Sequence, residues 1–375
     1  MNKKPPLIWL NIAIFTLTFA VALIGVPWYA LTHGFSWASG IIAAVFWLWS
    51  GISITAGYHR LWSHKAWQAH PSVQWVLAIG GAMALQNSIL HWCADHRVHH
   101  KHVDNNDKDP YSAKRGFWFS HMGWMLREYQ PDGHDYNNAR DLQKNPVVMH
   151  QHQHYGAWVL LTNIGLPVLL GWLCGDLLGT VLLAGFLRLV LVHHATFFIN
   201  SLAHIWGSQP YSDAHTSKDN GWLALVTYGE GYHNFHHTFE YDYRNGIRWW
   251  HFDPTKWLIK GLEKLKLASG LRRVPSDRIE AAKLKMQLKL SQQLLSRHQT
   301  TGEFLGKLEQ EYDQLLQKLQ AYYGEKQRLL KLQKHQLDRK ARRQLKELKQ
   351  AFELQQRQWQ LLRQQLHALT EEQQR

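Results

Sequence analysis

The sequence predicts an all-α integral membrane protein with four transmembrane helices, a helical cap holding a histidine-rich metal site, and a long helical tail at the C-terminus. Three observations predict this class. Four long segments are apolar enough to cross a bilayer, three short histidine clusters lie beside them, and a glutamine-rich stretch without proline follows residue 275. The mean hydropathy of -0.36 resembles that of a soluble protein because it averages these unlike regions.

The predicted spans form two hairpins. Each is nearly free of charged residues over the roughly 20 positions that a helix needs to cross the hydrocarbon layer. Tryptophan and tyrosine near their ends fit the aromatic belts of the two membrane interfaces. We expect the spans at residues 7–31, 35–57, 155–175 and 178–203. A signal peptide is the alternative for the first span, but no small-residue cleavage site stands out.

Positive charge predicts the orientation in the membrane. Residues 59–154 hold ten lysines and arginines, whereas the turns at 32–34 and 175–179 hold none. We therefore expect the long loop, the cap and both termini to face the cytoplasm. The segment from Ser72 to Trp92 is also uncharged, but a fifth crossing would place the first two histidine clusters on opposite sides. We predict a helix at the interface there, weakened as a span by two glycines.

Histidine spacing predicts a metal site. The second and third clusters have the pattern H-x-x-H-H, which on a helix places residues i, i+3 and i+4 on one face. The candidate ligands are His59, His64, His96, His99, His100, His233, His236 and His237. Because one zinc site needs only three or four ligands, eight donors indicate two metal ions. Imidazole binds iron, zinc, copper and nickel, so these residues alone do not name the metal.

Other polar residues near the clusters have weaker predicted roles. Acidic side chains could orient the histidine rings by hydrogen bonding, and the candidates are Asp95, Asp104, Asp107, Asp109 and Glu230. Packing or supporting roles are expected for His91, His102, His121, His193 and His194. The alternation of His150, His152 and His154 favours a strand or an extended loop near the membrane interface.

The tail, residues 276–375, has its own composition, with 20 Lys and Arg against 12 Asp and Glu. Apolar positions from Leu345 to Leu369 alternate steps of three and four, the pattern of a coiled coil, and a weaker register runs from Leu308 to Leu329. Breaks are predicted at Gly302, Gly306 and Gly324. One interpretation is a helical hairpin or self-associating stalk, and the other is a basic docking arm for an electron donor or anionic lipid. No nucleic acid partner is expected.

Four segments resemble, in order, the membrane acyl-CoA desaturases of the stearoyl-CoA delta-9 type. They are GYHRLWSH, DHRVHHKHVDNNDKDPYSAKRGFWFSHMGW, NSLAHIWG and GEGYHNFHHTFEYDYR. The likeness is specific because it extends beyond the histidines into the flanking residues. It covers roughly residues 10–265, so we expect a desaturase domain at 1–270 and leave the tail outside it.

The resemblance implies a di-iron site, with two Fe²⁺ ions held by nine histidines and one Asn. The ninth ligand would be His204, and Asn200 would hold a metal-bound water. An acyl tunnel, removal of two hydrogens from a saturated chain and reduction of O₂ to water are also implied. Asn87 matches an Asn that contacts the thioester end of the substrate. Arg127 is expected to serve the headgroup from a shifted position, because this chain lacks basic residues at the usual places.

Partners and alternatives follow from the same comparison. The chain has no G-x-G-x-x-G dinucleotide motif and no H-P-G-G segment of a fused cytochrome b5 domain. Electrons are therefore expected from a separate ferredoxin, cytochrome b5-like protein or flavin reductase, in a bacterial inner membrane. The acyl carrier stays open between coenzyme A, acyl carrier protein and phospholipid. The competing functions are a related lipid hydroxylase or ketolase, and a histidine-rich metal transporter, which would need polar residues lining its spans.

Overall fold

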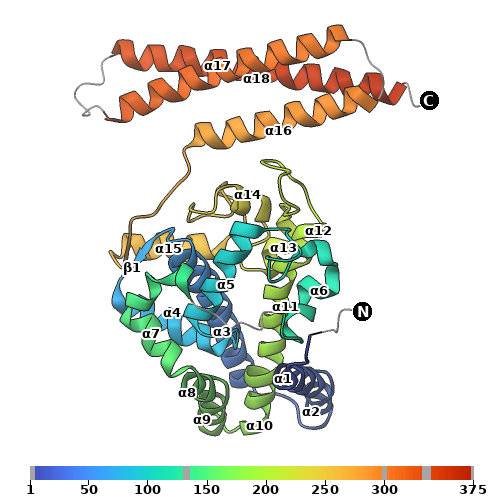
Figure 1. The fold of residues 1–375 in the computed structure, drawn as a ribbon. Helices are drawn as coiled ribbons and strands as arrows, with labels where there is room; N and C mark the ends of the chain where they lie inside the picture. Colours follow the sequence, from blue (N-terminus) through green and yellow to red (C-terminus); the bar gives the residue numbers. More distant parts are fainter. Residues whose placement is uncertain (1–4, 130–135, 298–301, 332–338, 373–375) are drawn as a thin grey trace. The chain divides into compact units, whose positions relative to one another are not determined.

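The computed structural model describes residues 5–129, 136–297, 302–331 and 339–372, and its regular structure is mostly helical (Figure 1). The chain divides into two compact units. The first comprises residues 1–209 and 214–273, and the second comprises residues 210–213 and 274–375.

Within the described residues, four helices are long and apolar enough to cross a membrane, as many as the sequence predicts. They are Trp9–Thr32, Trp37–Ser63, Tyr155–Leu173 and Leu177–Ile205. In the most apolar windows of the first and third, 11% and 17% of residues are buried, against 44% and 50% in the second and fourth. The second and fourth spans therefore form the interior of the unit, and the other two expose mostly apolar surface.

Each span combines α-helical stretches with wider π-helical turns. The α-helical parts are α1 (Trp9–Ala20) and α2 (Val26–Thr32), α3 (Trp37–Ile52), α8 (Tyr155–Leu160) and α9 (Leu166–Leu173), and α10 (Leu177–Thr180), α11 (Arg188–Asn200) and α12 (Leu202–Ile205). The π-helical turns cover Val21–Gly25, Ser53–Ser63, Leu161–Gly165 and Val181–Leu187.

One carboxylate joins the two hairpins at their turns. Asp176 accepts hydrogen bonds from the hydroxyls of Tyr29 and Ser39, both at 2.7 Å, and from the backbone of Ser36 at 3.0 Å. Burial alone would raise its pKa, but these hydrogen bonds lower the pKa to about 2. The carboxylate therefore stays ionised and holds the hairpin ends together.

The second span is longer than expected. The sequence predicts its end at residue 57, but the helix continues through π-helical turns to Ser63 and so includes His59. Every residue from Ser53 to Ser63 is buried. Single π-helical segments of this kind occur frequently at functional sites.

The predicted interfacial helix from Ser72 to Trp92 is wrong as a single element. The structure has two helices there, α4 (Pro71–Met83) and α5 (Ile89–His102). Leu85 and Asn87 between them have positive φ angles of 51° and 69°, which a helix cannot contain. The helix α4, with 13 residues, is also too short to cross a bilayer.

Shorter elements complete the first unit. They are α6 (Phe117–His121), α7 (Pro146–Gln153), α13 (Gly221–Val226), α14 (His233–Thr238), α15 (Pro254–Lys264), the antiparallel strands β1 (Gln68–Ala69) and β2 (Ala268–Ser269), and 3₁₀ turns at Ala113–Arg115, Gly123–Met125, Asn137–Ala139 and Leu142–Lys144. The strand or loop predicted for His150 to His154 is wrong. The asparagine at 145 caps α7 and Pro146 begins it, a strong helix start that the alternating histidines conceal.

In the part of the second unit that the structure describes, there are three helices, α16 (Ser276–Arg297), α17 (Gly302–Lys331) and α18 (Arg339–Glu372). Apolar residues of all three pack into one cluster around Trp359. Most of the predicted seam is buried, including Phe352, Leu362 and Leu366, whereas Leu369 is exposed. The breaks predicted at positions 306 and 324 are wrong, because α17 runs through both glycines.

Candidate metal centre and adjoining cavity

Nine histidines of the first unit meet in two groups, and they are the nine that the sequence and the resemblance predict. In each group, one ring nitrogen of every histidine lies within 4.8 Å of those of the others. The first group is His59, His64, His96, His100 and His236, and the second group is His99, His204, His233 and His237.

Helix geometry explains why each H-x-x-H-H cluster contributes to both groups. In α5, His96 and His100 are four residues apart and point to the first group, while His99 points to the second. In α14 the division is reversed, because His233 and His237 join the second group and His236 joins the first. The two groups are therefore neighbours that share two helices.

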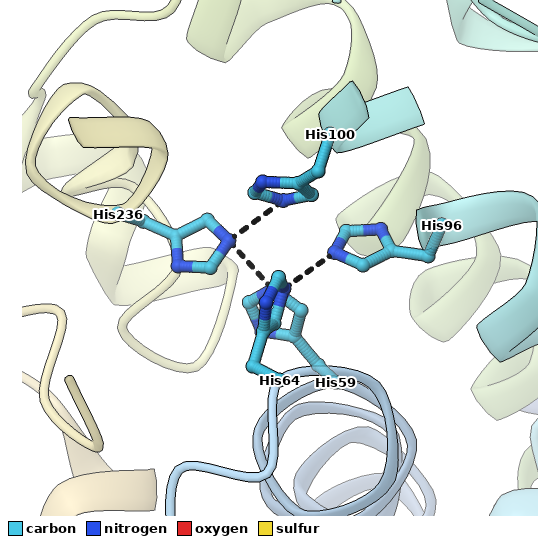
Figure 2. Close-up of side chains that lie close together, drawn as sticks. All are labelled: His59, His64, His96, His100 and His236. Atoms are coloured by element: carbon cyan, nitrogen blue, oxygen red, sulfur yellow. Dashed lines mark hydrogen bonds between the residues drawn. The ribbon is translucent and has the colours of Figure 1, made fainter. Parts of the chain in front are cut away.

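In the first group, the Nε2 atoms converge on a common centre (Figure 2). His236 Nε2 lies 2.9 Å from His59 Nε2 and 3.0 Å from His100 Nε2, and His64 Nε2 lies 2.9 Å from His96 Nε2. The second group forms a similar chain. His233 Nε2 lies 3.2 Å from His204 Nε2 and 3.1 Å from His237 Nε2, which is 3.3 Å from His99 Nε2.

Acidic side chains face the outer ring nitrogens of the first group. Glu230 Oε2 lies 3.0 Å from His59 Nδ1, and Glu240 Oε2 lies 3.2 Å from His100 Nδ1. A carboxylate in this position favours the tautomer that carries its proton on Nδ1 and leaves Nε2 free to bind a metal. Glu230 was predicted as a supporting carboxylate, whereas Glu240, three residues beyond the third cluster, was not.

Glu230 belongs to a buried ion network. Arg60 donates to Glu230 Oε1 at 2.8 Å and 3.2 Å and to Asp253 Oδ2 at 3.1 Å, and all three residues are at most 1% exposed. Burial alone would raise the pKa of Glu230, but His59 and Arg60 lower it to about 2. The network therefore keeps an ionised carboxylate against His59 and links the second span to the N-cap of α15.

Two glycines allow Glu230 to reach this position. Gly229 has a φ of +97°, and a Cβ there would meet Asp253 Oδ1 at 2.7 Å. A Cβ on Gly231 would meet the backbone nitrogen of Ala224 at 2.3 Å. The G-E-G sequence is thus required by close backbone packing on both sides of the glutamate.

The second group is supported by a loop rather than by a buried cation. His99 Nδ1 lies 2.9 Å from Asp109 Oδ1, and His204 Nδ1 lies 2.8 Å from the Thr216 hydroxyl. That hydroxyl donates to Asp104 Oδ1 at 2.6 Å. Asp104 and Asp109 were both predicted to support the rings, whereas no spacing signal points to Thr216.

The donor set of both groups fits bound metal ions. A neutral imidazole whose Nδ1–H faces a carboxylate or hydroxyl presents a bare lone pair at Nε2. Several such nitrogens at about 3 Å would repel each other without a cation between them. Burial, and secondly the neighbouring imidazoles, also lower the pKa of His96, His233, His236 and His237 well below 6.5. The rings are therefore held neutral, the form that binds metal.

A cavity of about 410 Å³ adjoins both groups. Its wall includes Trp92, whose ring stacks on His96 at 4.7 Å, and Tyr111, whose ring stacks on His99 at 4.5 Å. Apolar side chains from the first and fourth spans, including Phe15, line another part. The cavity thus brings an apolar ligand within one side chain of either histidine group.

The remaining predicted site residues line this cavity. Asn87, Arg127 and Asn200 are all in its wall, so the structure brings them to one space. Arg127 is tied elsewhere, because its Nη1 donates to the carbonyl of Pro5 at 2.6 Å. Asp107, predicted as a supporting carboxylate, is exposed and accepts no hydrogen bond from a histidine among the described residues.

The other histidines near the site make packing contacts. His193 Nε2 lies 3.0 Å from the carbonyl of Ala84 and so holds the turn between α4 and α5. His121 and His194 stack on each other, with a ring-nitrogen separation of 3.0 Å. His91 Nε2 lies 3.5 Å from Asp95 Oδ2, and neither residue belongs to the two histidine groups found among the described residues.

Comparison with known proteins identifies the family. The family model for fatty acid desaturase matches residues 35–268, which include all nine histidines. The chain belongs to the fatty acid desaturase family. The family relationship expected from the four quoted segments is therefore confirmed.

The chain is similar to desaturases whose names give different substrates. A probable acyl-CoA desaturase of Schizosaccharomyces pombe is 46% identical over 64% of the chain and 50% of its own length. An sn-2 palmitoyl-lipid 9-desaturase of Nostoc is 37% identical over 71% of the chain and 91% of its own length. A stearoyl-CoA desaturase of Sus scrofa is 35% identical over 75% of the chain and 78% of its own length. The chain spans only about half the length of the yeast relative.

Proposed function

We propose that this protein is an oxygen-dependent desaturase that introduces a cis double bond, at the delta-9 position, into a saturated fatty acyl chain. The observation that carries the proposal is the pair of neutral histidine groups beside a partly apolar cavity. The names of the acyl-CoA and acyl-lipid desaturases among its relatives support the reaction type.

We assign one iron ion to each histidine group, with Asn200 as the additional ligand through a water. When bound, the iron pair would supply dioxygen activation: the acyl chain loses two hydrogens, and O₂ is reduced to two waters with two further electrons from a separate donor and two protons from solvent. Four imidazoles would bind through Nε2, because the Nδ1 atoms of His59, His100, His99 and His204 face Glu230, Glu240, Asp109 and Thr216, respectively.

The cavity walls position the acyl chain. Trp92 and Tyr111 separate the chain from His96 and His99 by one ring, and Tyr111 also lies 3.2 Å from His96 Nδ1 through its hydroxyl. These rings exclude water from the side of the cavity nearest the histidines. The apolar residues of the first and fourth spans hold the rest of the chain by hydrophobic contact.

The membrane arrangement follows the charge distribution. We place the histidine groups, the helices around them and both termini on the cytoplasmic side of a bacterial inner membrane, because lysine and arginine gather in the loop between the hairpins. A ferredoxin, cytochrome b5-like protein or flavin reductase would deliver electrons there. The tail is assigned as a coiled-coil-like unit, and self-association through its outer surface remains a prediction.

Expression in a host that lacks its own desaturase tests the function. Fatty acid methyl esters from cells with the wild-type chain should contain a new delta-9 alkene, and His236→Ala should abolish it. Purified protein should contain iron. A hydroxylated product without alkene would replace desaturation by hydroxylation, and an alkene that persists in His236→Ala would refute the assigned centre.

A further inference from the structure

The net charge of the tail comes from two short segments. Residues 326–331 and 339–349 hold nine lysines and arginines against one glutamate. The rest of residues 276–375 holds eleven residues of each sign, so it is neutral. These two segments, which we call the basic end of the second unit, therefore carry the entire excess of 20 Lys and Arg over 12 Asp and Glu.

The two segments lie beside each other in the structure. The ring of Tyr322 in α17 stacks on that of Phe352 in α18, with centres 5.9 Å apart. Ten residues earlier in α17, the Tyr312 ring lies 6.2 Å from that of Trp359, which is later in α18. The two helices therefore run antiparallel (Figure 1), and the C-terminal residues of α17 meet the N-terminal residues of α18.

The cations of α18 are accessible. Arg342, Lys346 and Lys349 are spaced by four and three residues, which places them in a row on one helix face, and all three are exposed. Among the described residues, Arg342 and Lys346 form no ion pair with a carboxylate. Lys349 lies 3.4 Å from Glu353, and these side chains are 56% and 50% exposed. So exposed a pair is too weak to withhold the lysine from a ligand.

The composition of the basic end fits a lipid surface better than a protein. Residues 339–349 contain no aromatic side chain, the kind of residue that anchors most protein interfaces. The nearest large apolar residue of α17 is Leu330, which is 77% exposed. A layer of anionic headgroups needs no matching pocket, because it attracts each lysine or arginine separately.

The chain itself supplies such a surface. Strand β2 of the first unit ends at Ser269, and α16 of the second unit begins at Ser276. The basic end therefore belongs to a unit that is tethered by a short connection to four candidate membrane spans. Tethering raises the effective concentration of lipid for the tail, so that even weak attraction to each headgroup is sufficient.

We propose that the basic end of the second unit binds the anionic phospholipid headgroups of the membrane that the same chain spans. Arg342, Lys346 and Lys349 form the main contact, with the cations of α17 beside them. The contact strengthens with the fraction of anionic lipid and weakens with salt. The proposal uses the cytoplasmic placement of the C-terminus proposed above, but no step of the desaturase reaction.

Energy transfer from the tail to lipid tests this proposal in the full-length chain. A donor dye is attached to Gln344→Cys, an exposed position of α18 outside the row of cations. Cys174 is exposed and is replaced by serine, whereas Cys93 is buried and is retained. Nanodiscs carry an acceptor dye on their headgroups and contain phosphatidylcholine, with or without phosphatidylglycerol. Transfer should be stronger with phosphatidylglycerol and should lose this gain at about 1 M salt.

Two sets of substitutions locate the contact. The combination Arg342→Gln, Lys346→Gln and Lys349→Gln should shift the equilibrium about 100-fold toward the unbound tail. The matched control is Lys285→Gln, Lys307→Gln and Lys318→Gln, which removes as much charge from exposed positions outside the basic end and should retain most of the transfer. Arg342→Lys combined with Lys346→Arg keeps the charge and should behave as the wild type.

Equal transfer in the two kinds of disc would overturn the proposal. An equal loss in the control set would also overturn it, because only the total charge of the tail would then matter. If transfer were independent of lipid but the first set weakened binding of a two-iron ferredoxin, the basic end would instead be a docking surface for an acidic electron donor. Discs expose both faces of the bilayer, so the result does not depend on the orientation of the spans. The alkene assay decides the reaction separately.

Discussion

The two histidine groups use the same kind of ligand but are held by different physical means. The first group rests on an ionised network, in which buried Arg60 pairs with Glu230 and Asp253. The second rests on hydrogen bonds that the rings of His99 and His204 donate to the Asp109 carboxylate and the Thr216 hydroxyl. A buried cation that loses its counter-ion costs far more than a lost hydrogen bond to a neutral imidazole. The first group should therefore be the more sensitive to changes in its surroundings.

Two adjacent histidines give the largest expected effect. His236→Ala removes a donor from the first group and His237→Ala removes one from the second. Because both histidines are on α14, the two substitutions should disturb the local structure to a similar extent. We expect each variant to lose more than about 100-fold in metal affinity at its own group, beyond the range of supporting residues, and to form no alkene.

Iron content and alkene yield check this pair. Each purified variant should retain metal in the group that is unchanged. If His237→Ala lost all metal while His236→Ala kept half, metal binding by the first group would depend on the second group. That outcome would contradict independent metal binding by the two groups.

Acid should destabilise the metal-free chain through both groups alike. Burial lowers the pKa of His100 to about 4 and that of His64 and His233 well below 6.5. In the unfolded chain these rings bind protons below pH 6.5, so the unfolded state holds more protons than the folded state. The stability is complete above pH 6.5 and falls as the pH drops below it.

Thermal unfolding of metal-free protein measures this slope. We expect about 1.4 kcal/mol of lost stability per pH unit for each histidine that stays neutral, and a lower midpoint at about pH 5.5 than at about pH 7.5. Bound metal should reduce the dependence near neutrality by holding the rings unprotonated. A midpoint that does not change over this interval would contradict the neutral state of the buried rings.

A matched pair of supporting carboxylates tests the comparison directly. Glu230→Gln and Asp109→Asn each replace a buried carboxylate beside one histidine by a neutral isostere. Both should weaken metal binding about 10–100-fold at their own group. Only Glu230→Gln leaves a buried cation with one partner fewer, so it should also lower the free energy of unfolding, by up to about 3 kcal/mol.

Chemical unfolding and metal titration separate these effects. Glu240→Gln is the control within the first group, because the Glu240 side chain is 56% exposed and its loss should cost less than about 1 kcal/mol. Equal destabilisation by Glu230→Gln and Asp109→Asn would remove the distinction between the groups.

The sequence predicts ligands better than it predicts their grouping. Two H-x-x-H-H clusters and one H-x4-H pair identified eight rings. The resemblance added His204, because a single histidine at the end of an apolar span has no spacing signal of its own. The division of His96 and His99 between two groups depends on where α14 and the second span meet α5. Arg60 and Asp253 are 193 residues apart, and only tertiary packing reveals their contact.

The four membrane spans were predicted well because a long apolar composition is enough to identify them. The errors in the predicted helices lie where the local backbone geometry is not visible in the composition. Leu85 and Asn87 break an uncharged segment through left-handed backbone, a conformation that Asn tolerates but that a leucine gives no reason to expect. A Cβ on Gly80 would meet Ser53 Oγ at 2.2 Å, so this glycine permits close packing of α4 on the second span rather than marking a weak helix.

Removing residues 276–375 should have the smallest effect on both groups. All nine histidines and their described partners belong to the first unit. Asp213 would lose its ion pair with Lys289, in which the lysine is 50% exposed, and it lies three residues before Thr216. An exposed pair contributes less than about 1 kcal/mol, so metal content should stay within error of the full chain. Metal analysis of the truncated chain, with Lys289→Glu in the full chain as the control, checks this. If both the truncated chain and Lys289→Glu lost metal from the second group, the loop carrying Thr216 would depend on the tail. Loss of metal from the first group would contradict the support of that group by Arg60 and Glu230.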